Sequence, residues 1–188
     1  MNLPNKLTIL RIIMIPIFVA FFYVTVLKYN YIYAAAVFAL AAFTDFLDGY
    51  IARKYKLVTN LGKFLDPIAD KVLVSTALIV IAAQGEAMIK YFGPIAVSVI
   101  IARELIVSGL RMVAASTGLV LAADKIGKIK TFFQDIGVLL MLVYLAVGNG
   151  NDIMFYICNG VLCVAVILTI WSGISYIVKN REVFKENK

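Results

Sequence analysis

The sequence predicts an all-α integral membrane protein, and three observations support that fold class. Of its 188 residues, 63% are hydrophobic, and the mean hydropathy is +0.95. Soluble domains are roughly 45–50% apolar, and a chain this short has too little interior to hide so much apolar surface from water. The apolar residues also form six long runs, and nearly all basic residues fall on one side of the topology that these runs imply.

Each of the six runs is close to the roughly 20 residues that cross a bilayer as a helix. They cover about residues 9–27, 31–50, 65–83, 89–115, 131–147 and 153–178. The residues before the first run lack a small-residue cleavage site, so we expect a short interfacial segment and an uncleaved first helix rather than a signal peptide. No repeat or low-complexity stretch divides the chain, which indicates a single domain over residues 1–188.

The basic residues predict the orientation of these helices. All but two of the 18 Lys and Arg residues lie on one side, and only Lys28 and Lys90 lie on the other. Cytoplasmic loops of membrane proteins carry such an excess, so both termini are expected in the cytoplasm and the chain in the plasma membrane. The net charge of +7 is therefore attributed to topology and contact with anionic lipid rather than to nucleic acid.

Histidine is absent from the sequence. Histidine bases, metal ligands and nucleophiles are thereby excluded, so proton transfer has to come from carboxylates, lysine, tyrosine or metal-bound groups. Cys158 and Cys163 lie in an apolar run, which is typical of small buried side chains. They predict no disulfide framework.

Four aspartates are the strongest functional signal. Asp45 and Asp48 are three positions apart near the end of the second run, and Asp66 and Asp70 are four apart near the start of the third. Each pair shares one helix face, and the short basic linker brings the two faces together. Such carboxylates repel one another at low dielectric unless a multivalent cation neutralises them. An all-oxygen set favours Mg²⁺, Mn²⁺ or Ca²⁺, and four carboxylates would suit two ions.

Small residues beside the aspartates indicate a pyrophosphate site. Gly49, Ala52 and Gly62 would let a ligand approach the helix backbones. Arg53 would hold a phosphate or a pyrimidine edge, and the Thr59 hydroxyl would support these contacts. A cation-transport site is the alternative from another class, although such sites usually lie near the bilayer midplane.

The pattern D-x₂-D-G-x₂-A-R-x₈-G-x₃-D-x₃-D from Asp45 to Asp70 resembles the signature of the CDP-alcohol phosphatidyltransferase family. Further motifs extend the resemblance over most of the chain and are similar to members that use sn-glycerol 3-phosphate. They are residues 2–8, 11, 66–71, 103–104, 108–111 and 128–131. The resemblance implies six transmembrane helices, a homodimer and a polar cavity that faces the cytoplasm.

The same resemblance implies roles for individual residues. Asp45, Asp48 and Asp66 would ligate metal, with Mg²⁺ or Mn²⁺ as the cofactor, and Asp70 would be both ligand and general base. The head group of the donor, CDP-diacylglycerol, would lie against a set that includes the small residues above: Gly49, Ala52, Arg53, Thr59 and Gly62. We also expect Asn5, Thr8 and Arg11 beside the cytidine or the acceptor.

The acceptor phosphate needs cations in a second pocket. Arg111, Lys128 and Lys130 lie on the cytoplasmic side between the fourth and fifth runs, Arg103 is a further candidate, and Gln134 would contact a hydroxyl. The alternative is that these basic residues only reflect the positive-inside bias of the cytoplasmic loops. For Arg103, a further alternative is an ion pair with Glu104 or Asp135. Phosphatidylglycerol, serine or an inositol phosphate is the alternative acceptor.

Overall fold

The structure, a computed structural model, describes residues 3–55, 60–116, 125–147 and 151–181. Its described residues form six α-helices and no strand. The helices are α1 (Leu3–Tyr23), α2 (Asn30–Tyr55), α3 (Asn60–Gln84), α4 (Phe92–Ser116), α5 (Lys125–Val147) and α6 (Asp152–Lys179). The all-α prediction is confirmed for this part of the chain.

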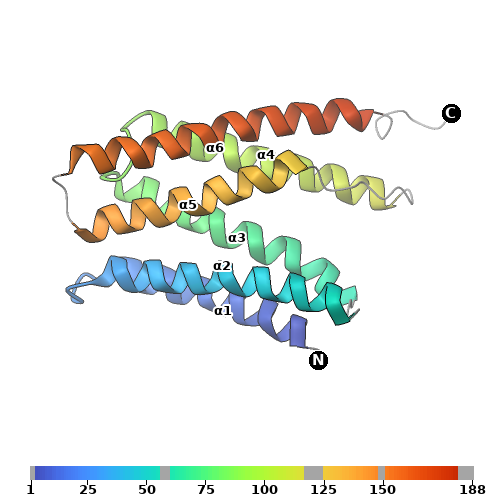
Figure 1. Ribbon diagram of the computed structural model, residues 1–188, viewed down its shortest axis with the longest axis horizontal. Coiled ribbons are helices and arrows are strands. Elements are labelled where there is room, and N and C mark those ends of the chain that lie inside the picture. The colour runs from blue at the N-terminus through green and yellow to red at the C-terminus, as the bar shows by residue number, and fades with distance from the viewer. Residues whose placement is uncertain (1–2, 56–59, 117–124, 148–150, 182–188) are drawn as a thin grey trace.

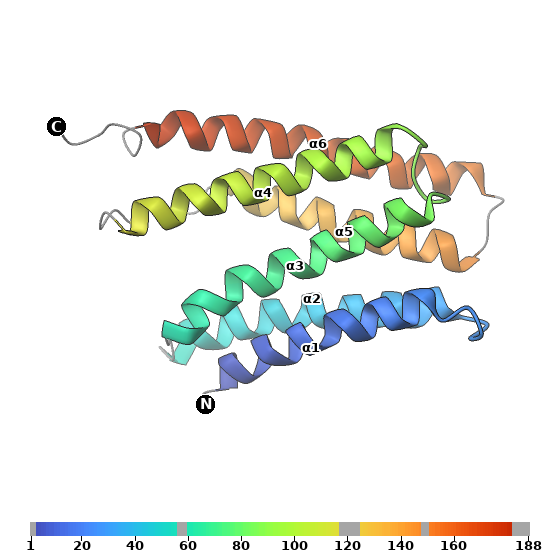
Figure 2. The same ribbon diagram turned by 180° about the vertical axis from the view of Figure 1, so that it is seen from behind.

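The helices lie side by side as a bundle, and both chain termini are at the same end (Figures 1 and 2). α1 packs against α2 and α3, α5 packs against α2 and α6, and α4 packs against α3 and α6. Successive helices run in opposite directions (Figure 1). The end of α2, the start of α3, the end of α4 and the start of α5 therefore meet at the end of the bundle that carries the termini.

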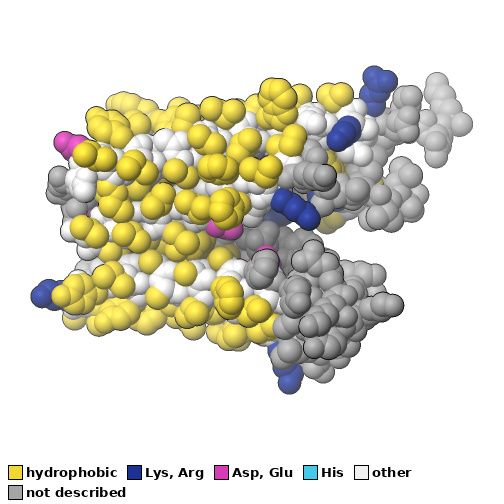
Figure 3. Space-filling view, in the orientation of Figure 1, with side chains coloured by type: hydrophobic (Ala, Val, Ile, Leu, Met, Phe, Trp, Pro, Cys, Tyr) yellow, Lys and Arg dark blue, Asp and Glu magenta, His cyan; other side chains and the backbone are white. Residues whose placement is uncertain are grey.

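Apolar side chains fill the interior and also cover the flanks of the bundle. Phe18 of α1, Phe38 of α2, Leu78 of α3 and Met141 of α5 are almost fully buried in one cluster. Large apolar side chains such as Leu105 and Trp171 are 68% and 66% exposed, respectively, and Figure 3 shows such residues along the whole visible flank. A surface this apolar is suited to lipid rather than to water.

Four helices are long and apolar enough to cross a membrane among the residues described: α1, α4, α5 and α6. In α3, a shorter apolar stretch, Lys71–Gln84, occurs among the described residues. The membrane class of the sequence prediction is thus supported, whereas passage of α2 and α3 through the bilayer stays a prediction.

The first helix differs from its predicted bounds. It begins at Leu3 and ends at Tyr23, so the residues expected as a separate interfacial segment form its opening turns. Pro4 is compatible with this start because a helix has no use for the N–H groups of its first turn. The helix therefore carries Asn5, Thr8 and Arg11 on one continuous face with Ile15 and its apolar successors.

Candidate active site

Three polar side chains of α1 point into the bundle near the end of α2. Asn5 is 5% exposed, and Thr8 and Arg11 are fully buried. Arg11 forms an ion pair with Asp45, whose Oδ1 lies 2.7 Å from the Arg11 Nη1 atom. A buried guanidinium has to be paired in this way, because an uncompensated charge in the interior is strongly destabilising. The pair joins α1 to the aspartate end of α2.

Asp45 is the one predicted metal ligand whose side chain the structure describes. Its side chain is 42% exposed, so it remains open to solvent or ligand on the side away from Arg11. No group of three acidic or cysteine residues suited to a metal ion occurs among the described side chains. The remaining predicted ligands, and most of the predicted donor contacts, lie outside those side chains: Asp48, Gly49, Ala52, Arg53, Gly62, Asp66 and Asp70. Thr59 lies outside the described residues altogether.

The backbone nevertheless fits the proposed metal set. Asp48 belongs to the last third of α2, and Asp66 and Asp70 belong to the first half of α3. The end of α2 and the start of α3 lie at the same end of the bundle (Figure 2). The donor set consists of carboxylate oxygens, which Mg²⁺ and Mn²⁺ prefer. The chemistry of the donors and the placement of their helices thus agree with the metal that the sequence predicts.

A second polar region lies between α3, α4, α5 and α6. It is a cavity of about 160 Å³, and its lining includes all four basic residues predicted for the acceptor phosphate: Arg103, Arg111, Lys128 and Lys130. One water occupies about 30 Å³ of liquid, so the cavity is suited to a small polar molecule. The structure therefore brings the four residues together, while their contact with a phosphate stays a prediction.

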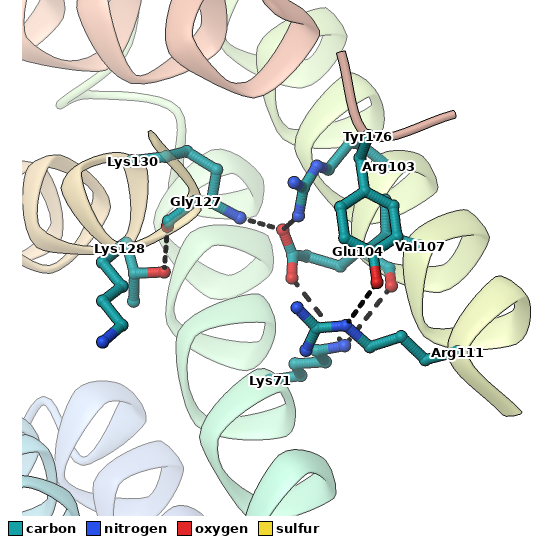
Figure 4. A pocket seen from close by; sticks show the side chains of 10 residues that line it. Lys71, Arg103, Glu104, Val107, Arg111, Gly127, Lys128, Lys130 and Tyr176 are labelled. Carbon is teal, nitrogen blue, oxygen red and sulfur yellow. Dashed lines mark hydrogen bonds and ion pairs between the residues drawn. The ribbon is translucent and has the colours of Figure 1, made fainter. Parts of the chain in front are cut away.

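Glu104 of α4 is the carboxylate at the centre of this cavity (Figure 4). Its Oε1 accepts from the Lys130 ammonium of α5 and lies 3.2 Å from Arg103 Nη1. Its Oε2 lies 4.0 Å from the Lys71 ammonium of α3. Lys71 also donates to the Ser108 hydroxyl and to the Glu104 carbonyl. One carboxylate thus ties three helices together, and the predicted pairing of Arg103 with Glu104 is confirmed.

Arg111 and Lys128 have different surroundings. The Arg111 Nε donates to the Tyr176 hydroxyl of α6 at 3.1 Å, and its guanidinium carbon lies 5.4 Å from the centroid of that ring. Tyr176 is 2% exposed, so it is a rigid support, whereas Arg111 and Lys128 are exposed. Among the residues that the structure describes, neither cation has a carboxylate partner.

Gly173 and Gln134 also contribute to the polar region between α3, α4, α5 and α6. Gly173 of α6 leaves room for Arg103, because a Cβ at that position would lie 3.0 Å from the Arg103 Cγ. Gln134 is 3% exposed and lines a smaller adjoining cavity with Lys71, Glu104 and Lys130. Its Nε2 has no hydrogen-bond partner among the described residues. An orphaned buried donor of this kind is costly, so it requires an oxygen to which it can donate.

Sequence reasoning did not assign Lys71, Glu104 or Tyr176 to the site. A signal existed for Glu104, because an acidic residue inside a predicted membrane helix is a functional candidate by default. Lys71 adjoins Asp70 in sequence, which places it beside the metal ligands. Tyr176 carries no such signal, since its partner Arg111 is 65 positions away.

A helical bundle with apolar flanks and a cation-lined cavity is consistent with a membrane protein. Residues 1–171 match the family model of the CDP-alcohol phosphatidyltransferases. The chain therefore belongs to the CDP-alcohol phosphatidyltransferase family.

Similar relatives include proteins named CDP-diacylglycerol–glycerol-3-phosphate 3-phosphatidyltransferase. That of Bacillus subtilis is 42% identical over 98% of this chain and 97% of its own length. That of Rickettsia typhi is 40% identical over 93% of this chain and 94% of its own length. That of Sodalis glossinidius is 38% identical over 96% of this chain and 96% of its own length. The likeness extends over nearly the whole of each protein.

Proposed function

We propose that this chain transfers the phosphatidyl group of CDP-diacylglycerol to sn-glycerol 3-phosphate, releasing CMP and phosphatidylglycerophosphate. The observation that carries the proposal is the cation-lined cavity beside the aspartate helix α3. Family membership supports the donor chemistry, and the names of near full-length relatives support the acceptor. The four aspartates, the small residues and Arg53 form the donor site in this proposal.

Divalent metal is part of the proposal because the donor site consists of carboxylates. Asp45, Asp48, Asp66 and Asp70 would hold Mg²⁺ or Mn²⁺, with two ions matching four carboxylates. Bound metal would supply positive charge that stabilises the pyrophosphate and the departing CMP. Arg11 would hold the Asp45 carboxylate in place at this end of the bundle through their ion pair.

The acceptor would occupy the cavity between α3 and α6. Its phosphate is matched by the basic side chains there, and its size suits about 160 Å³ of space. The Gln134 Nε2 donor would contact an acceptor hydroxyl, which supplies the partner that it lacks among the described residues. Lys71 lines the cavity and directly follows Asp70 in α3, so the acceptor and the proposed base belong to adjoining regions.

The proposed reaction is a direct displacement at phosphorus. The primary hydroxyl of glycerol 3-phosphate attacks the β-phosphorus of CDP-diacylglycerol, and Asp70 accepts the proton of that hydroxyl. The new O–P bond forms as the bond between the β-phosphorus and the bridging oxygen breaks, and the electron pair leaves with CMP. Fixed cations around the acceptor hold its hydroxyl in place, which lowers the entropic part of the barrier.

Topology and assembly complete the proposal. Six membrane-spanning helices with both termini and the cavity on the cytoplasmic side agree with the placement of all but two basic residues on one side. Figure 3 agrees with this bias, since most of the visible basic side chains lie toward the end with the termini. A homodimer in the plasma membrane is the assembly that the family resemblance implies.

Release of CMP tests the function directly. The purified chain in detergent micelles receives CDP-diacylglycerol, Mg²⁺ and one acceptor at a time: glycerol 3-phosphate, phosphatidylglycerol, serine or inositol phosphate. We expect CMP with glycerol 3-phosphate and little with the other alcohols. CMP release with another alcohol but not with glycerol 3-phosphate would refute the assignment of glycerol 3-phosphate as the acceptor. Cation flux in liposomes without CMP release from any mixture would favour the transporter alternative.

A pair of lysine variants serves as the control for the acceptor cavity. Lys128→Met removes a cavity cation, and Lys90→Met removes an exposed lysine from the loop between α3 and α4, outside the cavity lining. We expect the KM for glycerol 3-phosphate to rise several-fold in the first variant only. Equal KM values in the two variants would place the acceptor elsewhere.

A further inference from the structure

We propose that Glu104 is a positioning residue that divides the cavity cations into two groups, a role that rests on the proposed function. Glu104 holds Lys130, Arg103 and Lys71 as its own partners and leaves Arg111 and Lys128 to bind the acceptor phosphate. Two of the four residues predicted to bind phosphate would thus bind the protein's own carboxylate instead.

The first argument is that only some cations of the cavity lining have a carboxylate partner. Lys71, Arg103 and Lys130 gather around the single carboxylate that lines the cavity in the described structure. Arg111 and Lys128 lack a carboxylate partner in the same part of the chain. Five cations and one carboxylate line the cavity, so its net charge is positive, and the two cations without a carboxylate contact suit a phosphate monoester, whose charge is close to −2 near neutral pH.

The second argument is burial. The Lys130 and Glu104 side chains are 2% and 15% exposed. Lys130 depends on this ion pair, because removal of Glu104 would leave a buried ammonium without its carboxylate. Arg111 and Lys128 are exposed, so a ligand from water can reach them without breaking an existing ion pair. An arriving phosphate would therefore meet these two cations first.

The third argument is the position of Lys71. Its ammonium contacts Ser108 and lies 4.0 Å from the Glu104 carboxylate, both on α4. Because Lys71 directly follows Asp70, this contact ties the helix of the proposed base to the wall of the acceptor cavity. Glu104 thereby sets the position of the cavity cations relative to α3.

A double-mutant cycle tests the division of the cations. We measure kcat/KM for glycerol 3-phosphate in Glu104→Gln, Lys130→Met and the double variant. We expect Lys130→Met to lower kcat/KM several-fold, because Glu104 then keeps only Arg103 and Lys71 as partners, and Glu104→Gln to recover most of that loss. If Lys130 bound the acceptor directly, the double variant would remain as impaired as Lys130→Met.

A matched cycle excludes a general charge effect. Glu104→Gln adds net positive charge and would favour any anion, so it is combined with Lys128→Met as well. We expect no recovery in that second double variant, because Lys128 is not a partner of Glu104. Equal recovery in both cycles would overturn the proposal.

Phosphate inhibition gives a second readout that does not depend on a folded Lys130 variant. In Glu104→Gln the released cations should bind anions unproductively. Inorganic phosphate should therefore inhibit CMP release several-fold more strongly. The kcat and the KM for glycerol 3-phosphate should both fall. Glu104→Asp should restore both towards the original values. Unchanged phosphate inhibition in Glu104→Gln would refute the inference. If the unmodified chain releases no CMP with glycerol 3-phosphate, the proposed function itself fails, which is a distinct result.

Discussion

Tyr176→Phe removes a single oxygen that holds Arg111 in place. The Tyr176 hydroxyl accepts from Arg111 Nε at 3.1 Å, while the ring lies 5.4 Å from the guanidinium carbon. The variant keeps the ring and loses only the hydrogen bond. Hydrogen bonds to charged groups contribute about 1.5–3 kcal/mol when buried, and solvent around the exposed Arg111 reduces that contribution to about 1 kcal/mol. We therefore expect a roughly fivefold rise in the KM for glycerol 3-phosphate.

Tyr176→Leu extends the same perturbation, because it also removes the aromatic face beneath Arg111. A cation–π contact at an exposed site contributes about 0.5–1 kcal/mol. Together with the hydrogen bond, the loss is about 1.5–2 kcal/mol, which corresponds to a roughly 10- to 30-fold rise in KM. The two variants should thus form a graded series in which the donor KM changes little.

The assay is initial-rate CMP release in mixed micelles at saturating CDP-diacylglycerol, with glycerol 3-phosphate varied. Tyr156→Phe is the matched control, since Tyr156 is 68% exposed on the same helix α6 and does not line the cavity. Thermal unfolding of each variant in detergent measures any general loss of stability. An unchanged KM for glycerol 3-phosphate in Tyr176→Phe and Tyr176→Leu would refute the idea that Arg111 is positioned for the acceptor.

Three other predictions address the rest of the site. Gly173→Ala should displace Arg103 and lower kcat/KM several-fold. Gly160→Ala is the control on the same helix, because an added Cβ meets nothing within 4 Å there, and it should leave CMP release close to normal. Asp70→Asn should abolish turnover with little change in thermal unfolding, and near-normal turnover would remove Asp70 from the role of base. Chelation of divalent metal should stop CMP release, and Mg²⁺ or Mn²⁺ should restore it; activity that persists in excess chelator would contradict the metal site.

The helices were predictable because apolar runs of membrane length are a strong signal. The ends of the helices were less predictable, because polar residues continue a helix beyond its apolar part. α2 extends to Tyr55 and α3 begins at Asn60, so both reach beyond the runs predicted from hydropathy. This extension places the aspartates within helices rather than at their tips.

The cation-lined cavity was predictable in its residue types, but its ion pairs were not. The expected cytoplasmic side between the fourth and fifth runs predicted Arg111, Lys128 and Lys130, with Arg103 as a further candidate, and the cavity contains all four. Local sequence cannot show that Glu104 of α4 accepts from Lys130 of α5, because that contact depends on how the two helices pack. The pairing with Arg103 was foreseeable from adjacency alone.

The carboxylate in the cavity also bears on selectivity against membrane lipid. A cavity lined by five uncompensated cations beside an anionic bilayer would attract any phosphate, including lipid head groups, because clusters of basic residues bind such lipids. Glu104 offsets part of that charge and fixes three of the cations by direct contact. The remaining cations, Arg111 of α4 and Lys128 of α5, lie in the same cavity lining. On the proposed function, the same carboxylate that organises the cavity therefore favours a soluble acceptor over the lipids that surround it.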